Sequence, residues 1–229
     1  MNSDFFQPAK TLADKVNCLT LTKQFFQNTK INTSKKELLR SFTSYKEIPI
    51  QYMDQVHGYT SQVISSYSSM PIGRTDALFS STSNLALAAL SADCVPITLS
   101  KRDGSEFAII HAGWKGLVSG VIESCISSFT NDKNISAWIG PAISAKNYEV
   151  EEDVYNSFLS KDKDSKSSFH NQASNKWLLD LQGEVKRVLE KFQIQVQCSD
   201  ICTFDSELLY SYRKEQTEHR IVTIIWRDK

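Results

Sequence analysis

Three side chains able to bind a transition metal lie at the ends of apolar segments. His57 follows the extended segment 48–56, Cys94 lies in "ADCVP", and His111 ends the apolar part of "EFAIIHAG". Catalytic zinc usually takes three protein ligands from His, Cys or carboxylate and leaves a fourth position for water or substrate. The three residues are far apart in the sequence, and buried cysteines and hydrogen-bonded histidines also occur in ordinary cores. A shared zinc site is therefore a hypothesis at this stage.

The surroundings of these residues favour a site. Each lies beside a polar or glycine break at the end of an apolar run, where loops commonly carry functional groups. Asp76 and Asp93 occupy similar places. Either carboxylate can orient a ligand histidine, act as a general acid or base, or simply cap a turn.

The turn that follows His111 has a second possible use. In "HAGWKG" a predicted strand passes through Gly113 and Lys115 into a predicted helix. A helix start presents free N–H groups and a partial positive charge, which suit an anion. The segment does not match the P-loop pattern of nucleotide-binding proteins, and a tight turn with a solvated lysine is the alternative.

Basic and aromatic residues gather again before the last predicted strand. Tyr212, Arg213 and Arg220 lie in "YSYRKEQTEHRIVTIIW". Arginine offers a fixed fork of donors for phosphate or carboxylate. Surface cations of no specific role are the alternative.

The length and composition predict one globular domain spanning residues 1–229, and the charge balance favours a small-molecule ligand. Hydrophobic residues make up 41% of the 229 residues, and 26 basic residues balance 26 acidic ones, so the basic excess of a nucleic-acid binder is absent. We see no signal peptide and no apolar run of the ~20 residues that would span a membrane. Five cysteines at irregular spacings suggest reduced thiols in a cytoplasmic protein. We expect a monomer or a homodimer.

The elements that must position these residues follow from periodicity. We expect strands over 16–22, 106–113, 136–143 and 221–226. The polar segment 91–94 divides 84–100 into two strands or forms a bulge in one. Helices are expected over 35–42, 117–129, 150–158 and 177–192, with an exposed loop over 160–175. Because strands and helices do not alternate strictly, the predicted class is α+β with mixed sheets.

The remaining cysteines and the polar-loop histidine suggest no further site. Cys18 and Cys125 lie on apolar faces and are expected in the core. Cys198 and Cys202 are four apart without a histidine pair, so we interpret them as structural. His170 is expected in solvent.

Six motifs in order carry a family resemblance. "QVHG", "TDAL", "ADCVP", "HAGWKG", "WIGPAIS" with "YEV", and "CTF…YSYR" closely resemble the laccase-domain family, also called polyphenol oxidase or purine nucleoside phosphorylase, whose bacterial members include a peptidoglycan editing factor. The resemblance covers residues 55–226. It implies a mixed β-sandwich flanked by helices and a zinc ion held by His57, Cys94 and His111.

The resemblance also implies an activity. The family phosphorolyses adenosine, inosine, guanosine and methylthioadenosine, with an adenosine deaminase side activity. Its implied ligands are a nucleoside and phosphate, with no nucleic acid or membrane partner. In this chain we expect Cys94, Asp93, Asp76 and Lys115 to be catalytic. The substrate-binding candidates are Gly113, Lys115, Tyr212 and Arg213.

This chain departs from the family pattern in three places. The arginine and Gly-Gly-Val-Ser loop that usually follow the first strand are replaced by "LTLTKQFFQNTK", with Lys23 near the arginine position. "HAGWKG" replaces the commoner "HAGWRG", and His219-Arg220 replaces Gly-Arg. Lysine lacks the bidentate fork of arginine, so the departures bear on substrate binding and not on the metal ligands.

Other functions use the same residues. Without metal, Cys94 as nucleophile and His111 as base would make a thiol amidase acting on peptidoglycan precursors. Copper could replace zinc in a polyphenol oxidase, although a multicopper enzyme needs more than the four histidines present. A non-catalytic zinc-binding module would normally have four protein ligands, and three are found.

Overall fold

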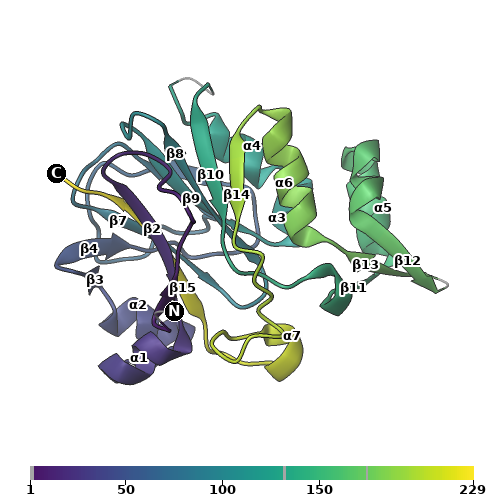
Figure 1. The fold of residues 1–229 in the computed structure, drawn as a ribbon, viewed down its shortest axis with the longest axis horizontal. Coiled ribbons are helices and arrows are strands. Elements are labelled where there is room, and N and C mark those ends of the chain that lie inside the picture. Colours follow the sequence, from purple (N-terminus) through teal and green to yellow (C-terminus); the bar gives the residue numbers. More distant parts are fainter. Residues whose placement is uncertain (1–2, 131–132, 174) are drawn as a thin grey trace.

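Two six-stranded mixed sheets packed face to face form the centre of the molecule (Figure 1). The computed structural model describes residues 3–130, 133–173 and 175–229. The first sheet has the order β1 (Phe5–Phe6), β2 (Val16–Leu21), β15 (Ile221–Arg227), β7 (Ala86–Ser91), β4 (Ile48–Gln51) and β3 (Ser44–Tyr45). The second has the order β14 (Gln195–Cys198), β10 (Ile135–Ile139), β8 (Val95–Lys101), β9 (Phe107–Ala112), β6 (Ala77–Ser80) and β5 (Ser61–Val63).

Helices cover the outer faces of both sheets. Against the first sheet lie α1 (Lys23–Thr29) and α2 (Lys35–Ser41). Against the second lie α3 (Trp114–Ser119), α4 (Val121–Ile126), α5 (Glu152–Lys161) and α6 (Leu181–Lys191). The short α7 (Tyr212–Glu215) precedes β15, and the described 3₁₀ turns are η1 (Ala145–Asn147) and η2 (Lys163–Ser168).

The apolar core has three layers because each sheet is buried on both faces. Leu78, Ile109 and Trp138 of the second sheet meet Leu87 and Ile225 of the first between the sheets. Further buried clusters lie under the helices on either side. This explains why "FAIIHA" is continuously apolar: β9 is central in its sheet and all six of its residues are buried.

The α+β class with mixed sheets in a helix-flanked sandwich is confirmed, and so is the break between β7 and β8. The helix expected over 117–129 is instead two short helices, because Gly120 adopts a positive φ of 90° between α3 and α4. Such a backbone conformation ends a helix and suits glycine. The anion-site prediction therefore falls at the start of a helix of only six residues.

The region 160–192 also differs from prediction. The segment expected to be a loop contains η2 and strand β12 (Phe169–Ala173), and the start of the expected long helix is strand β13 (Lys176–Leu179). With β11 (Glu149–Glu151) these strands form a third, three-stranded sheet beside α5 (Figure 1). The ring of Trp177 stacks on Tyr155 at 3.8 Å. Long-range pairing and stacking thus override the local helical spacing.

Smaller predictions have clear outcomes. Cys18 and Cys125 are buried in the core, and burial raises the pKa of each thiol to about 12. His170 is exposed on β12, as expected. None of the helices within the described ranges has the length and apolar character needed to cross a bilayer.

Candidate metal centre

Two strand ends and one loop bring the predicted metal ligands together. Cys94 immediately precedes β8, and His111 lies on β9, opposite Pro96 of β8. His57 arrives from the loop after β4 with a positive φ of 59°. One ligand atom from each of these three residues lies within 4.8 Å of the others, and the two imidazoles meet edge to face with their centroids 4.9 Å apart.

Asp76 holds two of these ligands in place. Its buried carboxylate accepts hydrogen bonds from the backbone N–H groups of His57 (3.0 Å), Val56 (3.1 Å) and Gly58 (2.7 Å). It also pairs with Nδ1 of His111 at 2.9 Å. Because an ionised carboxylate only accepts, Nδ1 of His111 carries the hydrogen and Nε2 is left for the centre.

The electrostatics of the cluster favour a thiolate at Cys94 beside a positively charged imidazole at His111. Burial disfavours a thiolate at Cys94, but the imidazoles of His111 and His57 outweigh it and lower the pKa of this thiol to about 6. Burial likewise opposes a charge on His111, yet Cys94 and Asp76 raise its pKa. For Asp76, burial is outweighed by hydrogen bonds from His111 and the loop amides, and its pKa is lowered. A thiolate and imidazoles form a donor set that fits a borderline metal such as zinc.

The glycines of "HAGWKG" have a packing role at this centre. A Cβ on Gly113 would lie 2.9 Å from Cδ2 of His57 and 3.0 Å from Sγ of Cys94. A Cβ on Gly116 would lie 2.9 Å from the carbonyl oxygen of Gly58. Both glycines therefore allow α3 to approach the ligand loop closely.

Asp93 connects the ligand turn to the segment before β15. Its φ is 102°, an unusual value for a residue with a side chain. Oδ1 accepts a hydrogen bond from Oγ1 of Thr203, and Oδ2 accepts one from the backbone N–H of Arg213, both at 2.6 Å. This carboxylate thus fixes the start of α7 beside Cys94.

The metal centre opens into a cleft of about 610 Å³. His57 is exposed to it, Cys94 is half-buried and His111 is buried. Ligand pockets commonly have volumes of roughly 300–1,000 Å³, so the cleft has room for a small organic molecule. Its lining includes four cations and several aromatic side chains: Lys35, Lys115, Arg213 and Arg220, with Trp114, Tyr148 and Tyr212.

The substrate-binding candidates lie together in this cleft. The ammonium of Lys115 is 5.6 Å from the ring centroid of Trp114. The guanidinium of Arg213 is 5.0 Å from the ring centroid of Tyr148, and its Nη1 donates to the carbonyl of Glu149 at 2.9 Å. Tyr212 is exposed.

Sequence reasoning did not single out Lys35 or Ser91, which also line the cleft. Lys35 starts a surface helix, and Ser91 ends an apolar strand, so neither has a local signal of function. Tyr148 is the first residue of the "YEV" motif, which was the available signal for it.

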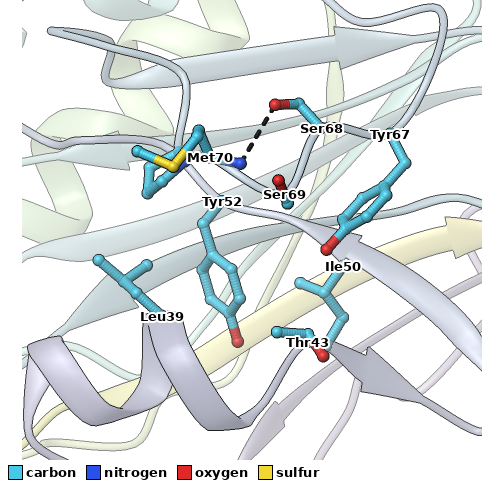
Figure 2. A pocket seen from close by; sticks show the side chains of 9 residues that line it. Leu39, Thr43, Ile50, Tyr52, Tyr67, Ser68, Ser69 and Met70 are labelled. Carbon is cyan, nitrogen blue, oxygen red and sulfur yellow. Dashed lines mark hydrogen bonds between the residues drawn. The ribbon is translucent and has the colours of Figure 1, made fainter.

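A separate small pocket carries no comparable chemistry. Leu39, Tyr52, Tyr67 and Met70 line it, and the N–H of Met70 donates to Oγ of Ser68 (Figure 2). Its volume of about 10 Å³ is that of a single water site at most. It is a packing gap between α2, β4 and the loop of residues 67–71.

Comparisons with known proteins identify relatives of this chain. The family model described as "Multi-copper polyphenol oxidoreductase laccase" matches residues 18–228. The chain is 35% identical over 180 residues to purine nucleoside phosphorylase YfiH of Escherichia coli (strain K12), which covers 76% of this chain and 72% of that protein. It is 31% identical over 201 residues to a purine nucleoside phosphorylase of Haemophilus influenzae, covering 86% and 81%.

Solved structures share the fold. A Neisseria meningitidis protein has a TM-score of 0.87 at 24% identity, with 99% of this chain and 100% of that chain covered. YlmD from Geobacillus stearothermophilus has a TM-score of 0.77 at 18% identity, with 99% of both chains covered. Chains of such low identity establish the architecture alone.

Proposed function

The chain belongs to the multi-copper polyphenol oxidoreductase laccase family, and from this premise we propose that it is a metal-dependent purine nucleoside phosphorylase. The proposed substrates are adenosine, inosine, guanosine and methylthioadenosine, with adenosine deamination as a side activity. The observation that carries the proposal is the His57, Cys94 and His111 cluster, which opens into a cation-lined cleft. Relatives named purine nucleoside phosphorylase support it.

The cation-lined cleft suits the reaction. In phosphorolysis a phosphate oxygen bonds to the anomeric carbon of the sugar, and the bond from that carbon to the purine nitrogen breaks. The electron pair stays on the purine, which takes up a proton, and a sugar phosphate is released. We assign Lys115 and Arg213 to the phosphate because they are the cleft cations tied to the metal centre. Lys115 follows the glycine that packs against the metal ligands, and the backbone N–H of Arg213 donates to Asp93, the residue before Cys94. Tyr212, Tyr148 and Trp114 offer aromatic surface for the purine.

The metal ligands are assigned as His57, Cys94 and His111, with zinc as the metal and copper as the alternative. A bound zinc would supply a Lewis acid that polarises an oxygen or a water. The donor set fits, because the hydrogen bond from Nδ1 of His111 to Asp76 directs Nε2 toward the centre, and Cys94 tends to the thiolate. In deamination, water would add to the amino-bearing carbon of adenosine and ammonia would leave.

The two aspartates receive a positioning role. Both oxygens of Asp76 and both oxygens of Asp93 accept hydrogen bonds from the protein. Asp76 orients His57 and His111, and Asp93 holds Arg213 near Cys94. We propose this role for them in place of the proton transfer expected from their sequence positions.

The proposal is tested by incubating the purified protein with adenosine, with and without phosphate, and separating the products by chromatography. Phosphate-dependent release of adenine is expected, with inosine as a minor product. His57→Ala should abolish turnover, whereas His170→Ala, which removes an exposed histidine outside the cleft, should retain it. If adenine does not appear, or if His57→Ala turns over normally, the proposal fails.

A second function is favoured by one observation. The lowered pKa of Cys94 beside His111 is also typical of a thiolate nucleophile with its base. In that case Cys94 would attack an amide carbonyl, His111 would protonate the leaving amine, and water would then hydrolyse the resulting thioester to release the acid. Alkylation of Cys94 would then block amide hydrolysis in metal-free protein, and chelation would leave the hydrolysis intact. Loss of activity on chelation would contradict the amidase.

A further inference from the structure

The cleft carries more positive charge than a neutral nucleoside and one phosphate need. Lys35, Lys115, Arg213 and Arg220 line it, and the lining carboxylate of Asp93 is already occupied by two donors. The whole chain has as many acidic as basic residues, so this excess is local. Phosphate at neutral pH carries about two negative charges.

These four cations come from two different walls. Lys115 follows β9 of the second sheet, and Arg213 contacts Tyr148 and Glu149 on the same side. Lys35 and Arg220 belong to the first sheet and its covering helices. The N–H of Arg220 donates to the carbonyl of Thr33 at 2.8 Å, and that of Lys35 to the carbonyl of Glu218 at 3.4 Å. The start of α2 and the start of β15 therefore lie side by side.

Ser91 adds an unused hydroxyl on this first-sheet wall. It ends β7 directly opposite Ile221, the residue after Arg220. Its side chain is only 2% exposed, lines the cleft, and makes no hydrogen bond with any described residue. A buried hydroxyl without a partner is costly in a folded protein. Its position indicates that a ligand supplies the partner.

The two cations on the same wall as Ser91 are also available for a ligand. Nη1 of Arg220 donates to the carbonyls of Thr217 and His219, at 2.7 and 2.8 Å, which fixes the guanidinium. Nε and Nη2 make no hydrogen bond within the described part of the chain. Lys35 meets Asp54 at 3.4 Å in an exposed pair, which is a weak interaction.

We propose that Lys35, Ser91 and Arg220 form a second phosphate-binding subsite on the first-sheet wall of the cleft. Since inorganic phosphate is assigned to Lys115 and Arg213, the second subsite takes a phosphate ester on the sugar. The cleft thus accepts nucleoside monophosphates as well as neutral nucleosides. This inference rests on the proposed nucleoside function of the cleft and extends its substrate class.

Calorimetric titration of the purified full-length protein with adenosine monophosphate and with adenosine tests the subsite. We expect the monophosphate to bind about tenfold more tightly, a preference typical of one or two charge-assisted hydrogen bonds. Lys35→Ala and Arg220→Gln should each reduce this preference about fivefold, and Ser91→Ala about threefold. The matched control is Lys36→Ala, an exposed lysine next to Lys35 and outside the cleft, which should retain the full preference.

Equal affinity for the two ligands, or a preference that survives Lys35→Ala, overturns the proposal. Because Arg220 also fixes its own loop, the exposed Lys35 variant decides the outcome if Arg220→Gln unfolds. If Lys35→Ala raises KM for inorganic phosphate instead, the subsite serves phosphate itself and the monophosphate assignment is wrong. Adenosine turnover is measured on the same samples: turnover without the monophosphate preference contradicts the subsite alone, and the preference without turnover contradicts the phosphorylase alone.

Discussion

Two buried polar clusters of this molecule differ in how completely their hydrogen bonds are satisfied. Beside α6, Glu184 accepts from Ser165, Ser168 and Arg187, and Arg187 also bonds Asp162. We call these five residues the α6 ionic cluster. It joins η2 to α6, and none of its five residues lines the cleft of the metal centre.

The metal centre and its cleft have the opposite character. The carboxylate of Asp76 is fully satisfied, and it holds His57 and His111 so that their ligand atoms and that of Cys94 face one another. Further along the cleft, the hydroxyl of Ser91 has no hydrogen-bond partner among the described residues. A cluster in which every polar atom has a hydrogen-bond partner contributes to stability. A cluster that is held in place by such bonds but leaves other polar or metal-binding atoms without a partner is suited to binding a ligand. Mutations in the two clusters should therefore change different measurements.

The largest expected effect is on activity at the metal centre. Cys94→Ala removes a ligand, so zinc content should fall below half of wild type and turnover should fall by roughly a thousandfold. The midpoint of thermal unfolding of the metal-free protein should change little, since the cleft keeps its support at Asp76. Cys198→Ala, at a half-buried cysteine outside the cleft, is the matched control for both elemental analysis and turnover. A Cys94 variant with full zinc content would show that the cluster is not the metal site.

Mutations in the α6 ionic cluster should lower the free energy of unfolding and leave the activity unchanged. Arg187→Met leaves the buried Glu184 carboxylate without its cation and should lower the free energy of unfolding by about 3 kcal/mol. Urea unfolding measures this change. Lys186→Met, which removes an exposed lysine 4.0 Å from Glu190, should cost less than about 0.5 kcal/mol.

The pH dependence of the free energy of unfolding further distinguishes the α6 ionic cluster from the metal centre. Burial alone would raise the pKa of Glu184, but hydrogen bonds from Arg187, Ser168 and Ser165 lower it below the unfolded value. Its contribution to stability is therefore present above the unfolded pKa of about 4.3 and lost as the pH falls through the lower folded value. In Arg187→Met this acid-induced loss should shrink. Zinc content and turnover per folded molecule in Arg187→Met should match wild type, and a loss of either at neutral pH would remove the distinction between the clusters.

Site residues could be predicted from the sequence where neighbouring residues alone mark them, and could not where the fold brings them to the site. His57, Cys94 and His111 stand out because each is a ligand type at the end of an apolar run. The support given by Asp76 was only one of several readings, since it depends on the loop 56–58 folding over β6. Ser91 and Lys35 have no local signal, because only the pairing of β7 with β15 and the approach of α2 bring them to the cleft.

The predictions of secondary structure divide in the same way between local patterns and long-range contacts. Continuous apolar strands such as β9 were predicted because burial on both faces leaves a local pattern. The helix predicted over 177–192 was wrong at its start, because Trp177 stacks on Tyr155 and β13 pairs with β11, which is distant in sequence, as well as with the adjacent β12. Helical spacing carries no information about such contacts.

A smaller effect is expected when the support of the metal centre is changed and its ligands are kept. Asp76→Asn retains the shape but cannot accept all of the N–H groups that surround the carboxylate. Zinc affinity should fall by about 10- to 100-fold, measured by competition with a chromogenic chelator. Asp54→Asn, at an exposed aspartate on the neighbouring loop, should leave the affinity unchanged. Wild-type affinity in Asp76→Asn would contradict the orienting role.

The smallest effect tests the packing of the glycine turn. Gly113→Ala places a methyl group against His57 and Cys94, and a displacement of a few tenths of an ångström should reduce turnover by about tenfold. Gly73→Ala, whose added Cβ meets nothing within 4 Å, should be silent. Equal turnover in the two variants would show that the ligand geometry tolerates displacement.

The central claim is that His57, Cys94 and His111 hold a catalytic metal, and anomalous X-ray diffraction tests it most directly. Crystals of protein purified without added metal are measured on both sides of the zinc absorption edge. We predict one anomalous peak within coordination distance of all three side chains. An absent peak, or a peak away from these residues, would contradict it.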